Sequence, residues 1–312
     1  MYDVIILGAG PAGLTAGLYA GRSRMRALLI EKGLDGGQIA TTNEIENYPG
    51  QLVDGEESGP SLIARMSKQV EKFGCERISD VVQSVELTGD VKKVVCTGGA
   101  YEAKTVIVAT GAHARPIGCK NEGQFVGKGI SFCATCDGFF YRDKEVYVVG
   151  GGDAAVEEAM FLTNFARKVT IIHRRDELRA AKSIQEKAFA NPKIEFLWDS
   201  VVEEVNGPSG ILSQIIVRNV KTDELSTIEA DENDGMFGLF GFIGFLPNTE
   251  LFDGQIEMED GYILTDENMA TNVPGVFAAG DLRKKSLRQV ITAAADGAIA
   301  ATQALKYIEH AE

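Results

Sequence analysis

Apolar and polar positions fall into blocks along the first thirty residues. Residues 2–7 form an apolar, β-branched run, and residues 14–23 have the small and apolar composition of a helix. Residues 26–30 form a second apolar run, which ends in Glu31. Three glycines at the spacing G-x-G-x-x-G separate the first run from the helix: Gly8, Gly10 and Gly13. This order predicts a βαβ unit of a parallel sheet, with a glycine turn before its helix.

The glycines and the acid of this unit match a dinucleotide-binding fingerprint. Gly8 permits a tight turn, Gly10 lets the backbone approach a pyrophosphate, and Gly13 lets helix and strand pack closely. The pyrophosphate would bind at the helix N-terminus, where free N–H groups and the helix dipole attract anions. Glu31 follows Gly8 by 23 residues, where a carboxylate accepts hydrogen bonds from an adenosine ribose. We therefore expect this unit to bind a dinucleotide.

The same arrangement returns in the middle of the chain. Residues 145–149 form an apolar run that leads into Gly150 and Gly152. A helix-like stretch, residues 154–166, and a further apolar run, residues 168–172, follow. The sequence thus predicts a second dinucleotide-binding unit.

The charge at the ribose position is inverted in this second unit. His173 follows Gly150 by the same 23 residues that separate Glu31 from Gly8. Three arginines come soon after it: Arg174, Arg175 and Arg179. An acid repels a 2′-phosphate, whereas an arginine cluster binds it. We therefore expect the first site to take an unphosphorylated ribose such as that of FAD, and the second to take NADPH; the alternative is a solvated, basic helix start.

Two later apolar runs belong with the first unit. Residues 105–111 predict a buried strand with a glycine exit, and residues 271–279 predict another, followed by Gly280 and Asp281. Asp281 would accept a hydrogen bond from a flavin's ribityl hydroxyl, and residues 288–304 predict a helix whose N-terminus faces the flavin pyrimidine edge. The predicted fold is α/β, with two Rossmann-like, three-layer ββα domains, one inserted into the other. The predicted FAD domain comprises residues 1–112 and 246–312, and the predicted NADPH domain comprises residues 115–243.

Composition and net charge argue against several classes of function. The chain has 312 residues and carries 31 Lys and Arg against 45 Asp and Glu, a net charge of −14. This balance argues against nucleic acid or an anionic membrane as partner. The longest mainly apolar window, residues 236–246, is shorter than the ~20 residues that cross a bilayer. The first residues lack the pattern of a secretory signal, and we expect a cytoplasmic protein.

A pair of cysteines carries the candidate chemistry. Cys133 and Cys136 are separated by two residues, a spacing that can close a small disulfide and often lowers the pKa of one thiol. Asp137 beside them can donate a proton to a leaving thiolate. A structural zinc site needs about four ligands, while the other three cysteines and the three histidines are scattered, so no metal is expected. Spacing alone favours the core for Phe139 and Phe140, with a partner-facing patch as the alternative.

These parts form a path for electrons. NADPH delivers a hydride, a flavin accepts it and passes the electron pair to a disulfide, and the dithiol then exchanges with a substrate disulfide.

With these motifs the chain resembles the low-molecular-weight thioredoxin reductases of bacteria over nearly its whole length. The most specific stretches are CATCDGFF, residues 133–140, and HRR, residues 173–175. The resemblance implies a homodimer that holds FAD tightly, and a large rotation between the two domains. It implies that Cys136 is the thiol nearer the flavin, that Cys133 attacks the thioredoxin disulfide, and that Asp137 is the acid–base residue.

The resemblance also completes the predicted binding sites, and it favours contact with thioredoxin for Phe139 and Phe140. The residues expected to bind FAD are Gly8, Gly10, Pro11, Ala12, Gly13, Glu31, Gly37, Gln38, Asn47, Thr110, Gly111, Gly280, Asp281, Arg288, Gln289 and Val290. The residues expected to bind NADPH are Gly150, Gly152, Asp153, Ala154, His173, Arg174, Arg175 and Arg179.

Two departures from the family pattern leave questions open. Asp153 stands where asparagine is commoner, and an acid near the pyrophosphate would weaken NADPH binding. Residues 235–246 are rich in glycine and phenylalanine, which indicates either close strand packing or a loosened hinge. The alternative function is a flavin disulfide reductase for another redoxin, glutaredoxin-like or peroxidase-linked. A ferredoxin–NADP reductase would lack the cysteine pair, and a flavin-binding sensor would not need Asp137.

Overall fold

The computed structural model describes residues 1–41, 45, 48–50 and 58–311, without the side chains of Cys136 and Ala311. The chain divides into two compact units, which we describe separately. Unit 1 comprises Met1–His113 and Leu246–Glu312, and unit 2 comprises Ala114–Phe245. No helix in the described part of the chain is both long and apolar enough to cross a membrane.

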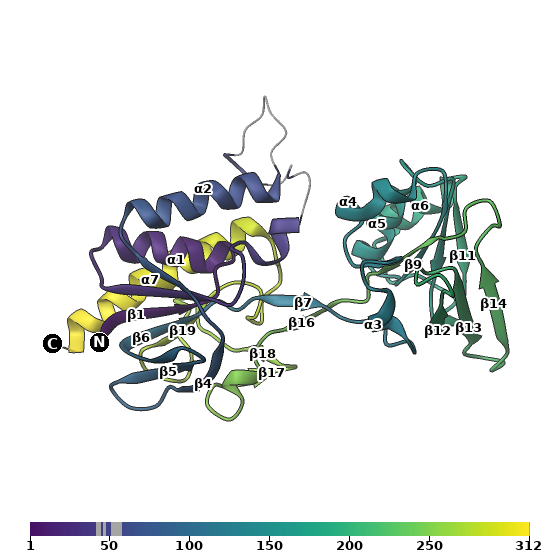
Figure 1. The fold of residues 1–312 in the computed structure, drawn as a ribbon. Helices are drawn as coiled ribbons and strands as arrows, with labels where there is room; N and C mark the ends of the chain where they lie inside the picture. The colour runs from purple at the N-terminus through teal and green to yellow at the C-terminus, as the bar shows by residue number, and fades with distance from the viewer. Residues whose placement is uncertain (42–44, 46–47, 51–57, 312) are drawn as a thin grey trace. The chain divides into compact units, whose positions relative to one another are not determined.

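Unit 1 is built on a seven-stranded sheet with helices on one side (Figure 1). The strand order is β3-β2-β1-β6-β5-β4, and β19 pairs with the C-terminal half of β6. In chain order the elements of this unit are β1 (Tyr2–Leu7), α1 (Pro11–Arg22), β2 (Ala27–Glu31), η1 (Gly37–Thr41), α2 (Gly59–Lys72), β3 (Glu76–Ser79), β4 (Val82–Glu86), β5 (Lys92–Cys96), β6 (Gly99–Val108), most of β7 (Ala112–Ala114), most of β16 (Phe245–Pro247), η3 (Glu250–Phe252), β17 (Met258–Glu259), β18 (Tyr262–Ile263), β19 (Val276–Ala278) and α7 (Val290–Ala311).

The order of these strands brings four strand ends to one edge. Strands β2, β1, β6 and β19 all run parallel, so their carboxyl ends point the same way. Gly8, Glu31, Ala109 and Gly280 stand at or just after those ends. Ligands of open α/β sheets bind at the carboxyl ends of the strands.

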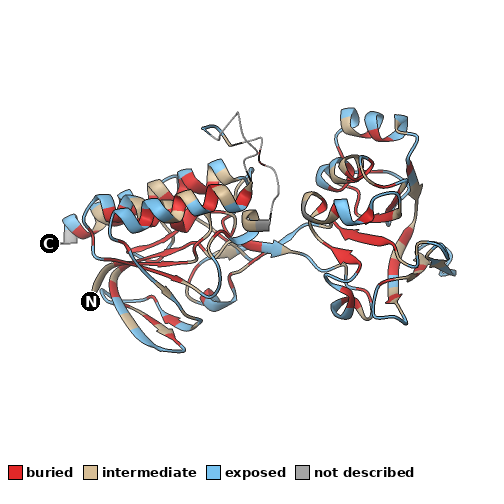
Figure 2. Ribbon diagram, turned by 45° about the horizontal axis from the view of Figure 1, so that its top comes forward, coloured by how far each residue is buried: buried red, intermediate tan, exposed pale blue. Residues whose placement is uncertain are grey.

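The alternation of side chains along β1 explains the layers of unit 1. Val4 and Ile6 point to the face covered by α1, α2 and α7, while Ile5 and Leu7 point to the face that also buries Val94 of β5. Burial on both faces, shown in red in Figure 2, is typical of a parallel sheet.

Unit 2 has a fully parallel five-stranded sheet in the order β11-β10-β9-β15-β8, and an antiparallel sheet β12-β13-β14. Helices α5 and α6 pack on one face of the parallel sheet, and the antiparallel sheet packs on the other. The elements are α3 (Glu122–Phe125), β8 (Ile130–Ser131), α4 (Ala134–Asp137), η2 (Gly138–Tyr141), β9 (Glu145–Val149), α5 (Asp153–Leu162), β10 (Lys168–Ile172), α6 (Lys182–Ala190), β11 (Ile194–Leu197), β12 (Ser200–Asn206), β13 (Gln214–Asn219), β14 (Leu225–Glu229) and β15 (Gly238–Gly241).

The predicted α/β class with two Rossmann-like sheets is confirmed, while several boundaries differ. Helix α1 begins at Pro11 rather than near residue 14, because proline suits the first turn, where its missing N–H costs nothing. The run 271–279 holds only the short strand β19, which begins directly after Pro274 and Gly275.

The glycine-rich segment 235–246 has a packing explanation at two of its positions. A Cβ on Gly238 would lie 3.0 Å from the Tyr141 ring, and one on Gly241 would lie 2.8 Å from the Phe132 ring. Gly244 differs, because it has open space around it and a φ of +110°, a value that favours glycine. Close packing therefore accounts for β15, and backbone conformation accounts for Gly244.

Candidate functional site

In the first glycine turn of unit 1, two glycines are closely packed and one has open space beside it. A Cβ on Gly13 would lie 1.8 Å from the carbonyl oxygen of Gly8, and one on Gly8 would lie 2.4 Å from that of Ala109. A Cβ on Gly10 meets nothing closer than the Gly36 oxygen at 3.9 Å. Gly8 and Gly13 are thus required by the fold, whereas the space over Gly10 is open to a ligand.

Alanine substitutions test this difference. Gly13→Ala should lower the free energy of unfolding by about 3 kcal/mol, because the helix must move away from the turn. Gly10→Ala should unfold like the wild type but bind FAD more weakly. Denaturant unfolding and flavin binding are the two measurements, and equal stability of the two variants would contradict this account.

The start of α1 carries no group that competes with an anion. Gly10 is its N-cap and makes no side-chain hydrogen bond, Pro11 follows, and the first turn has no acidic residue. The N–H groups of that turn are therefore available to a phosphate. Ala12 lies in that turn; its side chain is buried, and a Cβ on Gly297 of α7 would lie 2.1 Å from its carbonyl oxygen.

Glu31 at the end of β2 is fixed by two backbone amides. Its Oε2 accepts a hydrogen bond from the Ala9 N–H at 2.8 Å, and its Oε1 accepts one from the Gly33 N–H at 3.1 Å. The side chain is half-buried at the carboxyl end of the strand. These contacts tie the acid to the glycine turn, as the fingerprint requires.

Asp281 has an unused acceptor at the same sheet edge. Its Oδ1 is buried and has no hydrogen-bond partner among the described residues, and the Lys285 Nζ lies 3.6 Å away, an ion-pair distance. Burial raises the pKa of the Asp281 carboxyl, while Lys285 lowers it. A buried carboxylate with a free lone pair suits a hydroxyl donor, which is what a ribityl chain offers.

The remaining residues predicted to bind FAD lie in unit 1 with other contacts. Gln38 donates to the Ala112 oxygen at 2.8 Å, and Thr110 donates to the Asn248 oxygen at 2.6 Å. Arg288 lies over the Tyr262 ring, 4.2 Å from its centroid. Gly37, Gly111 and Gly280 all have positive φ, Gln289 directly precedes α7, and Val290 begins it. Asn47 lies outside the described residues.

The second glycine turn, in unit 2, is covered by a segment that folds back on it. The N–H groups of Arg179 and Ala180 both donate to the Gly151 oxygen, at 2.7 and 3.1 Å. Asp153 accepts from the Ala181 N–H at 2.6 Å. The carboxylate of Asp153 therefore holds this segment, a role that the sequence did not indicate. Ala154 beside it is exposed.

The fold-back brings Arg179 to the turn. A Cβ on Gly152, the N-cap of α5, would lie 3.4 Å from the Arg179 Nη2. Arg174, Arg175 and Arg179 are exposed, and none of them pairs with a carboxylate in the part of the chain that the structure describes. Three exposed guanidinium groups within one short segment, one of them at a helix N-terminus, suit a phosphorylated ribose.

His173, at the position that the fingerprint predicts for a ribose contact, is a buried side chain. A Cβ on Gly151 would lie 2.4 Å from its ring, and its Nε2 is buried without a partner. Burial is the main cause that lowers the pKa of His173, and the neighbouring arginines lower it further. Trp198 lies edge-on to the imidazole with ring centroids 6.4 Å apart. Sequence reasoning missed this tryptophan, whose only signal was its place just after β11.

The cysteine motif of unit 2 is oxidised in the structure. Cys133 is disulfide-bonded, while Cys75, Cys96 and Cys119 are free and buried. The side chain of Cys136 lies outside the described residues, although its backbone belongs to α4. Burial raises the pKa of the Cys75 and Cys119 thiols to about 12, so these two cysteines are unreactive, buried groups.

Helix α4 and its neighbours hold the motif at the surface of unit 2. The Cys133 N–H donates to Ser131 Oγ at 3.1 Å, and the Asp137 N–H donates to the Cys133 oxygen at 3.2 Å. A Cβ on Gly138 would lie 3.0 Å from Leu162, so the motif packs closely on α5. Asp137 and Phe140 line a pocket of about 380 Å³.

The two phenylalanines after the motif are exposed. Phe139 and Phe140 retain 60% and 68% of their accessible surface, so the core position that their spacing suggested is wrong. The Arg142 guanidinium lies 5.3 Å from the Phe139 centroid. Adjacent exposed aromatic rings beside a disulfide are suited to contact with another protein.

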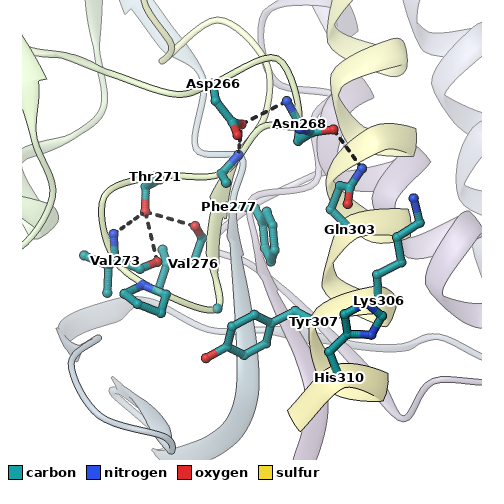
Figure 3. A pocket seen from close by; sticks show the side chains of 13 residues that line it. Asp266, Asn268, Thr271, Val273, Val276, Phe277, Gln303, Lys306, Tyr307 and His310 are labelled. Atoms are coloured by element: carbon teal, nitrogen blue, oxygen red, sulfur yellow. Dashed lines mark hydrogen bonds between the residues drawn. The ribbon is translucent and has the colours of Figure 1, made fainter.

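Another pocket, of about 400 Å³, lies elsewhere in unit 1 (Figure 3). It is formed between the loop before β19 and the last turns of α7, where Asn268 accepts a hydrogen bond from Gln303 and Tyr307 faces Phe277. None of the predicted site residues that the structure describes lines it. Among the described residues, no group of three or more His, Cys, Asp and Glu could hold a metal ion.

Comparison with known proteins gives consistent matches over the full chain. A family model described as pyridine nucleotide-disulphide oxidoreductase matches residues 2–297. The chain is 56% identical over 310 residues to a thioredoxin reductase of Peptoclostridium acidaminophilum, covering 99% of this chain and 98% of that protein. It is 48% identical to one of Streptomyces coelicolor, covering 98% and 94%. The crystal structure of Lactococcus lactis thioredoxin reductase matches with a TM-score of 0.86 at 44% identity, covering 99% of this chain and 100% of that one.

Proposed function

Because the chain belongs to the pyridine nucleotide-disulphide oxidoreductases, and among them to the low-molecular-weight thioredoxin reductases of bacterial type, we infer that it is a thioredoxin-disulfide reductase. The observation that carries this function is the disulfide at Cys133, directly before the short helix α4, with Asp137 at the end of that helix donating its N–H to the Cys133 oxygen. The motif stands in the same unit as a glycine turn and an arginine cluster suited to NADPH. A disulfide in that setting is a redox group rather than a structural link.

The family implies a flavin and a nicotinamide coenzyme, and we propose FAD for unit 1 and NADPH for unit 2. The open space over Gly10, the anchored Glu31 and the free acceptor of Asp281 support FAD. The unpaired Arg174 and Arg175 support a 2′-phosphate. When bound, FAD supplies two-electron transfer between a reduced nicotinamide and a disulfide.

The protein's own residues then carry out the exchange. Two electrons and two protons convert the disulfide of Cys133 and Cys136 into two thiols. The Cys133 thiolate attacks one sulfur of the thioredoxin disulfide, which breaks that bond and forms a mixed disulfide. Cys136 attacks Cys133, restores the enzyme disulfide and releases reduced thioredoxin. Asp137 gives a proton to the leaving thiolate.

Assembly and partner contact complete the proposal on the strength of the resemblance. Phe139 and Phe140 would contact thioredoxin, two copies of the chain would form a homodimer, and the two units would rotate between half-reactions. The expected compartment is the cytoplasm. A glutaredoxin-like or peroxidase-linked redoxin is the alternative partner, and it would use the same cysteines.

The test begins with the visible absorption spectrum of the purified protein. We expect a bound flavin that NADPH bleaches, and turnover when oxidised thioredoxin is added. Parallel assays with other redoxins identify the preferred partner. Bleaching without reduction of any disulfide would contradict the function, and an equal or higher kcat/KM with NADH would contradict the coenzyme.

A further inference from the structure

Four charged side chains form a buried cluster next to the first glycine turn. They come from the loop that follows β19 and from α7: Asp281, Arg283, Lys285 and Asp296. The side chains of Arg283, Lys285 and Asp296 keep only 9%, 11% and 10% of their accessible surface. Two acids and two bases balance one another, so the cluster can be buried without net charge.

Asp296 is the centre of this cluster. Its Oδ2 accepts from the Arg283 Nη1 at 2.9 Å, from the Lys285 Nζ at 2.9 Å and from the Gly280 N–H at 3.0 Å. Arg283 is held in turn by Thr265, whose Oγ1 accepts from its Nε at 2.8 Å. The acid on α7 thus fixes both bases and the backbone directly before Asp281.

Lys285 is placed between two carboxylates. Its Nζ lies 2.9 Å from Asp296 and 3.6 Å from the Oδ1 of Asp281. The longer distance leaves the buried Oδ1 without a hydrogen bond, although a full positive charge stands beside it. The Asp281 carboxylate is therefore stabilised as an anion while one of its oxygens stays available to another donor.

We propose that Lys285, fixed by Asp296, is a positioning residue that keeps the Asp281 carboxylate charged and available to a hydroxyl of bound FAD. The proposal rests on the proposed function, because it presupposes FAD in unit 1. It gives Lys285 a role in cofactor affinity without contact with the reacting atoms.

The charges that face Asp281 determine the direction of the effect. Burial has the largest effect on the pKa of Asp281 and raises it, and Asp296 on α7 raises it further. Lys285 and Arg288, on the same loop as Asp281, lower this pKa. The charged carboxylate accepts a hydrogen bond from a hydroxyl more strongly than the neutral acid does, so FAD affinity should be full above the pKa and fall as pH drops through it. Removing Lys285 raises the pKa of Asp281, so the midpoint of the pH-dependent loss of FAD affinity moves to higher pH.

The midpoint is measured by adding FAD to the apoprotein at a series of pH values and following the fluorescence of the flavin. Lys285→Met and Lys285→Gln should move it to higher pH and weaken FAD binding near neutrality about tenfold. Lys285→Arg should restore the wild-type midpoint. The matched control is Lys284→Met, which removes the same charge at the neighbouring position. The Lys284 side chain pairs with Glu259.

The outcomes separate this inference from the proposed function. A wild-type protein that takes up no FAD would contradict the function itself. FAD binding by the wild type with one common midpoint in every variant would overturn only the inference. A loss of affinity that is uniform across pH, or failure of both neutral variants to fold, would make Lys285 a packing residue and would overturn it as well.

Discussion

Replacing Cys133 with serine should lower NADPH-dependent reduction of thioredoxin by at least about 10³-fold, because the nucleophile of the exchange step is lost. Bleaching of the flavin by NADPH should persist, since that step does not use the thiol. Stopped-flow absorbance measures the flavin step, and a coupled assay with oxidised thioredoxin measures the whole reaction.

The chain offers a control of the same residue type for this variant. Cys119→Ala removes a buried thiol whose pKa is raised to about 12, and its turnover should stay within about twofold of the wild type. Turnover of Cys133→Ser within tenfold of the wild type would contradict the assignment of the nucleophile.

The double substitution of Arg174 and Arg175 by alanine should raise the KM for NADPH about 100-fold and leave that for NADH unchanged. Each guanidinium can make charge-assisted hydrogen bonds of about 1.5–3 kcal/mol to a phosphate, and NADH lacks that phosphate. Because the groups bind coenzyme away from its reactive ring, kcat should change little. Steady-state kinetics with NADPH and with NADH gives kcat and KM for each coenzyme.

Lys221→Ala is the control for the arginine variant. This lysine lies near the cluster but already pairs with Asp176 at 2.9 Å and Asp199 at 3.0 Å, so its charge is not free for a ligand. Its removal should leave the KM for NADPH within about twofold. An equal rise for NADH and NADPH in the arginine variant would mean that the cluster supports folding rather than the 2′-phosphate.

The parts of the molecule that the sequence predicts well are those encoded by neighbours in the chain. Both glycine turns, Glu31 at the end of β2 and His173 at the end of β10 follow from strand, turn and helix patterns within about thirty residues. The inserted order of the two units also follows, because the second fingerprint stands between segments that complete the first sheet.

The parts that the sequence predicts poorly depend on contacts between distant residues. Asp153 binds the Ala181 amide, 28 positions away, so its charge does not simply oppose a pyrophosphate. Asp296 reaches back to Gly280 and Lys285 from α7, and no local pattern marks that contact. Phe139 and Phe140 have the spacing of core residues, and only the packing of η2 leaves both rings exposed.

The edge-on contact between Trp198 and His173 makes the second unit optically distinct from the first. The chain has a single tryptophan, so all of its tryptophan fluorescence comes from Trp198, beside the imidazole of His173. Emission from an indole responds to a charge or an aromatic ring placed nearby, whereas the yellow chromophore expected in unit 1 absorbs and emits in the visible. Bound as proposed, the two coenzymes would therefore be followed in one sample at two separate wavelengths, without any label being attached.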